Sequence, residues 1–341
     1  MRAVITTVRT SRQTMRRTRG KARLRRAGRQ RRPLKRQSAR ASQRDAAGNG
    51  ISDARSSYAG LHNVEFERGY RSGIADGAEN LLERHVPAGR IIPDVTADEA
   101  MEAGVQTLLP RSLPLLGVEQ VFEELDSAVR EGYPYAFIRL GDGELATLAQ
   151  EVVLPVADVR IASPFLPYAG VVVPDLHARD RLAEAIRDAS LVGVPISRQP
   201  NYQPLLFRVL RSHHIPCAGL RLTTSTMNYA LYEHDYLPRL LAGRKVLLVG
   251  NVAGELARVF HGQGYHVVGV VSPVRGFGDV DRIVAEGAAY DFDIALVSAG
   301  IPAIPIVVRL AALTGKVAFD FGHLADRIAG VKTRISLQTR E

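Results

Sequence analysis

Short apolar runs of strand length recur between residues 135 and 320, and most of the gaps between them are long enough for a helix. The runs are residues 135–140, 191–195, 216–222, 245–250, 266–271, 293–298 and 316–320. Apolar runs that alternate with helical segments are typical of parallel strands that are buried on both faces. The pattern therefore predicts an α/β fold with a mostly parallel sheet and helices on both faces.

Helical segments are also expected before the first strand. Residues 117–131 carry apolar side chains at helical spacing, namely Val118, Val121, Phe122, Leu125, Ala128 and Val129. A connector helix is expected at about 64–85, although Gly69, Gly73 and Gly77 weaken it. Thr96 is a suitable N-cap for a short helix that runs through Leu109.

The charge is unevenly distributed along the chain. Residues 1–44 hold 17 of the 45 Lys and Arg residues and no acidic residue, which leaves 28 basic against 35 acidic residues in the remainder. Such a segment repels itself and lacks the apolar spacing that a core requires. We therefore expect a disordered Arg-rich tail over 1–60, a helical connector over 61–112, the folded domain over 113–332 and a C-terminal tail over 333–341.

The basic segment has three open interpretations. As a polycation, residues 1–44 can bind phosphate backbones or anionic surfaces non-specifically and in a salt-dependent way. The segment can also be a solvated extension without a dedicated partner. Its Arg-, Ser- and Thr-rich composition without acidic residues also fits a transit peptide.

Neither a membrane span nor a disulfide is expected. The longest uncharged stretch, 294–308, contains Gly300, Pro302 and Pro305 and is shorter than the roughly 20 residues that a spanning helix needs. Cys217 is the single cysteine, and its apolar neighbours favour a buried structural thiol. A single cysteine is typical of a reducing compartment, so we expect a cytoplasmic protein.

Polar residues follow five of the predicted strands. They lie in residues 139–144 (Arg-Leu-Gly-Asp-Gly-Glu), 250–251 (Gly-Asn), 272–273 (Ser-Pro), 298–302 (Ser-Ala-Gly-Ile-Pro) and 320–323 (Asp-Phe-Gly-His). In Rossmann-like folds, ligands bind outside the carboxyl ends of parallel strands. We therefore expect these five segments to converge on one edge of the sheet.

Asp142 and Glu144 are the candidate metal ligands. Two residues apart, their side chains leave a regular helix on nearly opposite faces, so both can address one ion only from a turn, which Gly143 permits. Carboxylate oxygens suit Mg²⁺ or Mn²⁺, and Arg139 can hold a phosphate beside them. Alternatively, Asp142 caps the next helix, Glu144 complements its dipole, and Arg139 organises the turn through an ion pair. A capping box with Asp142 as the cap requires the acid three residues later, not two.

Two other strand ends are candidate phosphate sites. Residues 245–254 resemble the start of a nucleotide-binding strand-turn-helix unit at Gly250 and Asn251, although the full glycine pattern is missing. Residues 298–302 place Pro302 at a helix start, where free N–H groups can bind a diphosphate. Tight strand-to-helix packing and a plain loop are the respective alternatives.

Further polar groups can act on a sugar. His323 follows Asp320 by three residues at the end of the last predicted strand, where it can act as a general base. The pairs 201–202 and 228–229, both Asn-Tyr, offer amide and aromatic groups for a base or a sugar ring. Structural roles are the alternative for each.

Taken in order, the segments at 139–144, 246–251, 298–303 and 320–323 resemble those of glycosyltransferases with the GT-D fold, over roughly residues 113–330. The resemblance implies a metal-dependent hexosyltransferase. The implied donor is a nucleotide-diphosphate sugar, UDP-linked and carrying glucose or a similar hexose, and the implied acceptor is a glycan or glycoprotein.

The resemblance also implies roles for individual residues. An Asp-x-Glu pair serves the metal, Mn²⁺ or Mg²⁺, and the diphosphate in that family, and this maps onto Asp142 and Glu144. We expect these two to be catalytic together with Asp320 or His323, which would remove the acceptor proton. The expected donor-binding residues are Arg139, Gly141, Gly143, Asn228, Tyr229, Gly250, Asn251, Ser298 and Gly300.

Two other function classes compete with this interpretation. A dinucleotide- or adenosylmethionine-dependent enzyme would use residues 245–271, but that class needs an acid after the next strand and residues 270–273 (Val-Val-Ser-Pro) offer none. A non-catalytic protein that binds nucleic acid or a surface would act through its Arg-rich arm.

Overall fold

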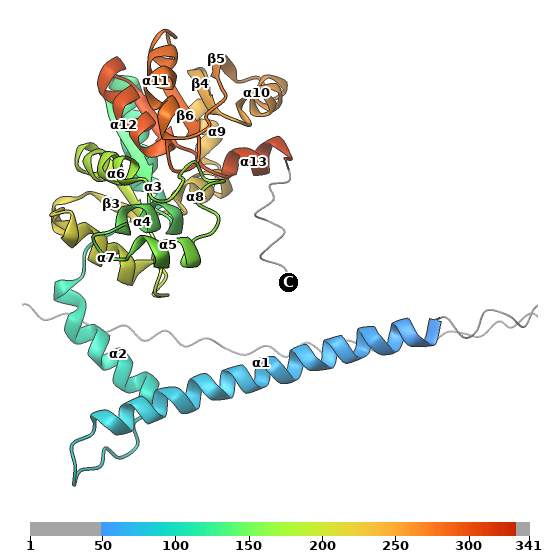
Figure 1. Ribbon diagram of the computed structural model, residues 1–341, viewed down its shortest axis with the longest axis vertical. Coiled ribbons are helices and arrows are strands. Elements are labelled where there is room, and N and C mark those ends of the chain that lie inside the picture. Colours follow the sequence, from blue (N-terminus) through green and yellow to red (C-terminus); the bar gives the residue numbers. More distant parts are fainter. Residues whose placement is uncertain (1–48, 332–341) are drawn as a thin grey trace, which may run out of the picture. The chain divides into compact units, whose positions relative to one another are not determined.

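The computed structural model describes the backbone of residues 49–331 and the side chains of residues 65–331. The Arg-rich segment 1–44 and the C-terminal tail 333–341 lie outside the described residues. The chain divides between Val105 and Gln106 into two compact units. The first contains a long helix, and the second contains the sheet (Figure 1).

The described part of the first unit is mostly helical. Helix α1 (Asn49–His85) contains the predicted connector helix but begins earlier, so residues 49–60 are helical and the prediction of disorder is wrong there. No proline interrupts residues 49–85, and the glycines weaken the helix without ending it. In the described part of the chain, no helix combines the length and apolar character needed to cross a membrane.

Thr96 caps helix α2 (Ala97–Leu108), as the sequence predicts. The Thr96 hydroxyl accepts the N–H of Glu99 at 3.2 Å, and the Glu99 carboxylate accepts the N–H of Thr96 at 2.8 Å. This reciprocal pair is a capping box. A 3₁₀ turn, η1 (Leu109–Arg111), follows.

The second unit is built on a parallel sheet of seven strands in the order β3-β2-β1-β7-β6-β4-β5. The strands are β1 (Tyr135–Arg139), β2 (Leu191–Val194), β3 (Leu222–Thr224), β4 (Lys245–Gly250), β5 (His266–Val271), β6 (Ile294–Ser298) and β7 (Val317–Asp320). Every pairing between neighbouring strands is parallel. The sequence-based prediction of the sheet is therefore confirmed.

The third predicted strand is misplaced. Residues 217–219 form a 3₁₀ turn, η2 (Cys217–Gly219), and β3 begins only at Leu222, which pairs with Val192 of β2. Pro216 has no N–H to donate to a neighbouring strand, and the N–H of Gly219 bonds back to the Pro216 carbonyl at 3.0 Å. The apolar run from 216 to 222 therefore starts as a turn.

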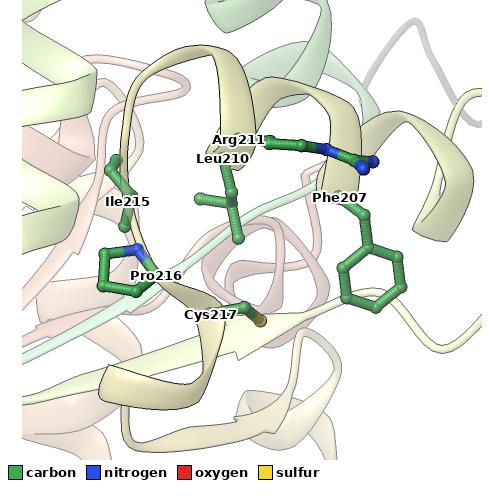
Figure 2. A pocket seen from close by; sticks show the side chains of 6 residues that line it. All are labelled: Phe207, Leu210, Arg211, Ile215, Pro216 and Cys217. Carbon is green, nitrogen blue, oxygen red and sulfur yellow. The ribbon is translucent and has the colours of Figure 1, made fainter.

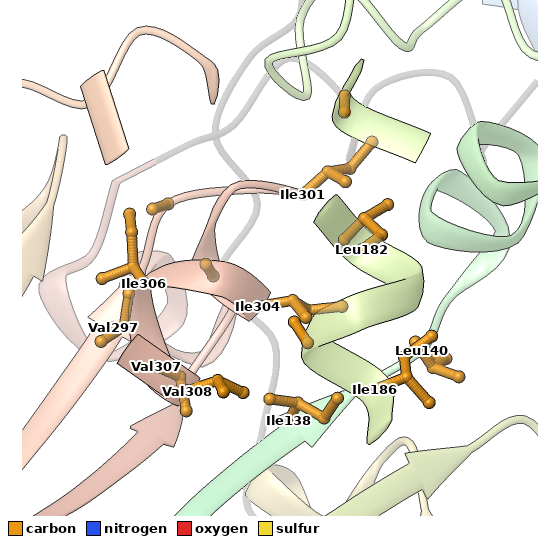
Figure 3. Close-up of a cluster of buried hydrophobic side chains, with 14 of the residues drawn as sticks. Ile138, Leu140, Leu182, Ile186, Val297, Ile301, Ile304, Ile306, Val307 and Val308 are labelled. Atoms are coloured by element: carbon orange, nitrogen blue, oxygen red, sulfur yellow. The ribbon is translucent and has the colours of Figure 1, made fainter. Parts of the chain in front are cut away.

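Helices cover both faces of the sheet. One buried cluster contains side chains of α4 (Asp142–Ala149), α5 (Val156–Ala162), α6 (Leu176–Asp188), α7 (Gln203–Ser212), η3 (Phe277–Asp279), α11 (Val280–Ala288) and α12 (Ala303–Thr314). The other contains those of α3 (Val118–Glu131), α8 (Met227–Glu233), α9 (Tyr236–Leu241), α10 (Ala253–Gly262) and α13 (Leu324–Ala329). Figure 3 shows part of the first cluster, where α6 and α12 meet the β1 side chain Ile138.

Strands β1 and β7 lie side by side near the middle of the sheet, and the segments that follow them cross to opposite faces. Helix α4 follows β1 onto one face, whereas α13 follows β7 onto the other. In open α/β sheets, ligands bind where such a divergence occurs at the carboxyl edge, the edge at which the parallel strands end. The fold thus places residues 139–144 and 320–323 on the two sides of this divergence.

Gly250 holds β4 against β6. It has φ +136°, and a Cβ atom there would lie 2.0 Å from the Ser298 carbonyl oxygen. We expect Gly250→Ala to lower the free energy of unfolding by about 3 kcal/mol or more, because backbone strain adds to a steric clash. Urea unfolding measures the change in the free energy of unfolding. Gly264→Ala is the control, since Gly264 has φ +83° but no atom within 4 Å of the added Cβ, and it should cost only about 1 kcal/mol. Equal losses in both variants would contradict this account.

Candidate active site

The carboxyl edge brings four of the predicted segments into a chain of contacts. A Cβ on Gly143 would lie 3.3 Å from both Phe165 and Ile301, and the Ile301 N–H donates to the Ala169 carbonyl at 3.1 Å. A Cβ on Gly170 would lie 3.0 Å from Pro302 and 3.4 Å from Gly276. Residues 163–171 therefore connect the end of β1 with the loops after β6 and β5.

The loop after β5 is tied to the end of β4 by Asn251. The Asn251 amide donates from Nδ2 to the Val274 carbonyl at 2.9 Å, and its Oδ1 accepts the Val274 N–H at 2.8 Å. The fifth segment, 320–323, joins the edge through β7, which pairs with β1 and β6. The predicted convergence of all five segments is confirmed.

Arg139, at the end of β1, is the hub of a buried polar network. Its Nε donates to the Asp320 carbonyl at 2.8 Å, and Nη2 donates to the Asp320 carboxylate at 3.0 Å. Its Nη1 donates to the Ser225 carbonyl at 3.0 Å and to Asn228 Oδ1 at 3.3 Å. Four of the five N–H groups of the guanidinium are therefore engaged within the protein. The ion-pair alternative for Arg139 is the arrangement that the structure shows.

Asn228 and Gly322 complete this network. Asn228 is fully buried and donates from Nδ2 to the Phe321 carbonyl at 2.9 Å, so its amide joins α8 to the end of β7. Gly322 has φ +55°, and a Cβ there would lie 1.9 Å from Arg139 Nη2. Only glycine leaves room for the guanidinium. Both residues position Arg139 and Asp320.

Helix α4 begins one residue earlier than the capping argument assumed. Gly141 is the N-cap, so Glu144 is the acid three residues after the cap, and its Oε2 accepts the Gly141 N–H at 2.8 Å. Asp142 is the first helical residue, and its Oδ1 accepts the Gly143 N–H at 3.0 Å. The expectation that both acids stand on a turn is wrong. Both carboxylates nevertheless fold back to the start of α4, because each accepts a backbone N–H there.

The two carboxylates differ in their surroundings. The pKa of Glu144 is raised to about 7, first because burial removes water from the carboxylate and second because the charge of Asp320 lies nearby. Burial also raises the pKa of Asp320, and the Arg139 guanidinium acts in the opposite direction. Asp142 lies near Tyr202, whose pKa is raised by burial and then by the Asp142 charge.

The raised pKa of Glu144 predicts a pH-dependent stability. Without a divalent cation, the folded protein holds the Glu144 proton up to about pH 7, whereas the unfolded chain releases it near 4.5. The free energy of unfolding of the wild type, relative to Glu144→Gln, should therefore fall as the pH rises from 4.5 to 7, by up to roughly 3 kcal/mol. Urea unfolding of both proteins across this range measures the difference, and a constant difference would contradict it.

His323 and Tyr229 lie on the α13 side of the network. His323 is exposed, and its charge acts on the pKa of Asp320 and of Asp326. Burial raises the pKa of Tyr229, which lies near Arg139, and the Arg327 guanidinium lies 5.9 Å from the Tyr229 ring. The structure thus places His323, unlike Asp320, where solvent or a substrate can reach it.

The loop after β6 offers fewer free N–H groups than the sequence suggests. The N–H groups of Ala303 and Ile304, at the start of α12, donate to the carbonyls of Gly300 and Ile301. The prediction of free donors there is wrong, because the loop forms a tight turn at Gly300, with φ +63°, that uses them. The Ser298 hydroxyl oxygen, in contrast, is buried without a hydrogen-bond partner in the described part of the chain.

Asp142 and Glu144 suit a divalent cation only if a bound substrate supplies further oxygen ligands. Across residues 65–331, no group of three His, Cys, Asp or Glu side chains is placed to hold a metal ion. The backbone bonds of Asp142 and Glu144 engage one oxygen of each carboxylate. Mg²⁺ commonly binds one or two carboxylates together with substrate phosphates and water, and two carboxylates at one helix start suit that mode.

Two features of the edge were not predicted from the sequence. One is the loop 163–171, whose contacts join distant segments and which carries no polar motif. The other is Arg275, an exposed residue in the loop after β5. The sequence signal that points to Arg275 is its position, four residues beyond the end of β5.

A surface depression lies elsewhere. It has a volume of about 360 Å³ and is lined by α7 and by residues just before β3, as Figure 2 shows for Phe207, Leu210, Arg211, Ile215, Pro216 and Cys217. Because these residues precede β3, they lie at the opposite edge of the sheet from residues 139–144. Cys217 is only partly buried, less than the sequence predicts, and this burial raises the pKa of its thiol.

Comparison with known proteins places the sheet unit in a family. A family model described as a GT-D fold-like domain matches residues 116–328. Two solved structures of a domain of unknown function, 1792, are similar. One is described as having a distinct glycosyltransferase fold; it is 16% identical, with 60% of this chain and 78% of that chain covered and a TM-score of 0.41. The other, a selenomethionine form, is 17% identical, with the same coverage and a TM-score of 0.39.

No curated protein matches the chain. The family match covers more than half of the 341 residues and contains all seven strands and the whole carboxyl edge. A glycosyltransferase is the enzyme class that this fold supports. The chain belongs to the GT-D-like family.

Proposed function

We propose that the protein is a metal-dependent glycosyltransferase. It transfers a hexose, such as glucose, from a nucleotide-diphosphate donor to a hydroxyl group of a glycan or glycoprotein. The expected donor is a UDP-linked sugar. The cation is Mn²⁺ or Mg²⁺, and the compartment is the cytoplasm. The observation that carries the proposal is the start of α4, where Asp142 and Glu144 follow β1, the strand that pairs with β7, in a chain of the GT-D-like family.

The acidic pair would hold the cation at this edge. When bound, the cation neutralises charge that develops on the leaving nucleoside diphosphate. Asp142 is partly exposed and bonds only its own helix start, so it can reach a ligand without breaking the network around Arg139. Glu144 lies deeper, and its ionised form is favoured by any cation that approaches it.

His323 is the better candidate for removing the acceptor proton. Asp320 is 5% exposed, and its carboxylate accepts a hydrogen bond from Arg139 Nη2 while its backbone carbonyl accepts one from Arg139 Nε, so the carboxylate is committed to the network. His323 is exposed in the turn after β7, and an imidazole nitrogen is a common general base. The general-base role therefore falls to His323, with Asp320 as a neighbouring negative charge.

The test is the release of nucleoside diphosphate from a panel of nucleotide sugars. The full chain is incubated with UDP-, GDP-, ADP- and dTDP-linked hexoses, with Mn²⁺, with Mg²⁺ and with a chelator. The expected result is metal-dependent release from at least one donor, and from UDP-linked sugars first. Release that is equally fast in chelator, or no release from any donor, would contradict the proposal.

A further inference from the structure

The diphosphate of the proposed donor needs a cationic side chain that Arg139 does not provide. The Arg139 side chain is 15% exposed, and its guanidinium is engaged by Asp320, Ser225 and Asn228. Turning it toward a ligand would leave the buried Asp320 carboxylate without its counter-charge, which is costly. A diphosphate at this edge must therefore be met by another group.

Two other arginines lie in loops that directly follow strands at the carboxyl edge. Arg198, after β2, donates from Nη1 to the Gln203 side chain at 3.2 Å. Arg275, after β5, is exposed, and among residues 65–331 its guanidinium has neither a hydrogen-bond nor an ion-pair partner. Asp279 is the nearest acid to it in the loop, and that carboxylate accepts the backbone N–H of Arg275 and pairs with Arg282 instead.

The backbone that carries Arg275 is fixed on both sides. Val274 makes two hydrogen bonds with the Asn251 amide, and the Arg275 N–H donates to Asp279 Oδ2 at 2.9 Å. A Cβ on Gly276 would lie 3.0 Å from the Gly170 carbonyl oxygen, so the loop also lies against residues 163–171. A free guanidinium on a fixed backbone loses little entropy beyond its own side chain when it binds a ligand.

A buried group without a partner lies next to the same loop. Ser298 pairs with Gly250 at the end of β4, directly before Asn251, and its hydroxyl oxygen has no partner within the described part of the chain. Buried hydroxyl groups are seldom left unpaired in folded proteins. An oxygen-rich ligand that lies over the carboxyl ends of β4 and β6, which pair at Gly250 and Ser298, would satisfy it.

We infer that Arg275 binds the diphosphate of the nucleotide donor from the loop that the Asn251 amide holds in place. The inference rests on the proposed function. A guanidinium makes paired, charge-assisted hydrogen bonds to phosphate oxygens. Of the two arginines in these loops, Arg275 is the one with no guanidinium donor engaged within residues 65–331, whereas Arg198 already bonds Gln203. Arg139 then has a structural task and Arg275 a ligand-binding task.

The test is calorimetric titration of UDP, GDP, ADP and dTDP, with Mn²⁺ present, into the full chain and its Arg275→Ala and Arg275→Lys variants. Arg211→Ala is the matched control, because Arg211 is also exposed, has no side-chain partner in residues 65–331, and lies at the opposite edge of the sheet. We expect Arg275→Ala to weaken the best ligand about 10- to 100-fold, Arg275→Lys to weaken it less, and Arg211→Ala to leave it unchanged.

The outcomes separate the two proposals. If the wild type binds a nucleoside diphosphate and Arg275→Ala binds it equally well, the inference about Arg275 is wrong and the proposed function stands. If Arg211→Ala weakens binding as much as Arg275→Ala, the effect is one of net charge, and the inference is again wrong. If the wild type binds none of the four ligands, the proposed function fails, and the inference fails with it.

Discussion

Asp142→Asn is expected to lower kcat/KM for hexose transfer by at least about 100-fold, because the amide cannot supply the charge that holds a divalent cation and its diphosphate. The fold should survive. Asp142 is partly exposed, and its single side-chain hydrogen bond, to the Gly143 N–H, can be accepted equally by an amide oxygen. Steady-state release of nucleoside diphosphate from the best donor of the panel measures the loss.

Asp158→Asn is the matched control for this variant. Asp158 also lies in the first turn of a short helix, α5, and is exposed. It should retain the activity of the wild type, and thermal unfolding should show both variants folded. An Asp142→Asn protein that is folded and retains more than about a tenth of the activity would contradict the assigned role of the carboxylate.

Arg139→Ala should be the most destabilising single substitution considered for this site. It removes the counter-charge of the buried Asp320 and the donors for the Ser225 carbonyl and Asn228 Oδ1. Breaking a buried ion pair from one side typically costs about 3–5 kcal/mol. Urea unfolding, followed by circular dichroism, should show a loss of this size.

A double-mutant cycle separates the ion pair from simple loss of packing. Arg139→Met keeps much of the side-chain volume, and Asp320→Asn removes the buried charge. The double variant should be less destabilised than the sum of the two single variants. Each single variant leaves one buried charge without its partner, whereas the double variant leaves none. Additive losses, or an Arg139→Ala protein within about 0.5 kcal/mol of the wild type, would show that the pair is not the source of stability.

Six of the seven strands could be predicted from the sequence because each is a short apolar run. Five of them are buried, and β5 is partly buried at the edge of the sheet. The remaining strand, β3, is only three residues long, and Pro216 and Gly219 shift its start. A three-residue strand contributes too little periodicity to be located, and its position depends on pairing with β2. The extension of α1 to Asn49 was missed because tail composition outweighed helix propensity in that segment.

The convergence of polar segments at one edge followed from the strand ends alone, since parallel strands finish on the same side. The partners of Arg139 did not follow, because Ser225, Asn228 and Asp320 lie 86, 89 and 181 residues away along the chain. Whether Gly141 or Asp142 caps α4 depends on which of them has non-helical backbone angles. Gly141 is extended, so it is the cap. The distinction between an engaged and a free arginine, Arg139 and Arg275, likewise needs the fold.

The central claim is that the start of α4, beside β7, binds a divalent cation together with the diphosphate of an activated sugar. The most direct measurement is anomalous diffraction at the manganese edge from crystals of the full chain grown with Mn²⁺ and the best nucleoside diphosphate. The account predicts a manganese peak in contact with the Asp142 carboxylate and with phosphate oxygens. A nucleotide bound at another face of the sheet, or a manganese ion that touches neither Asp142 nor Glu144, would contradict it.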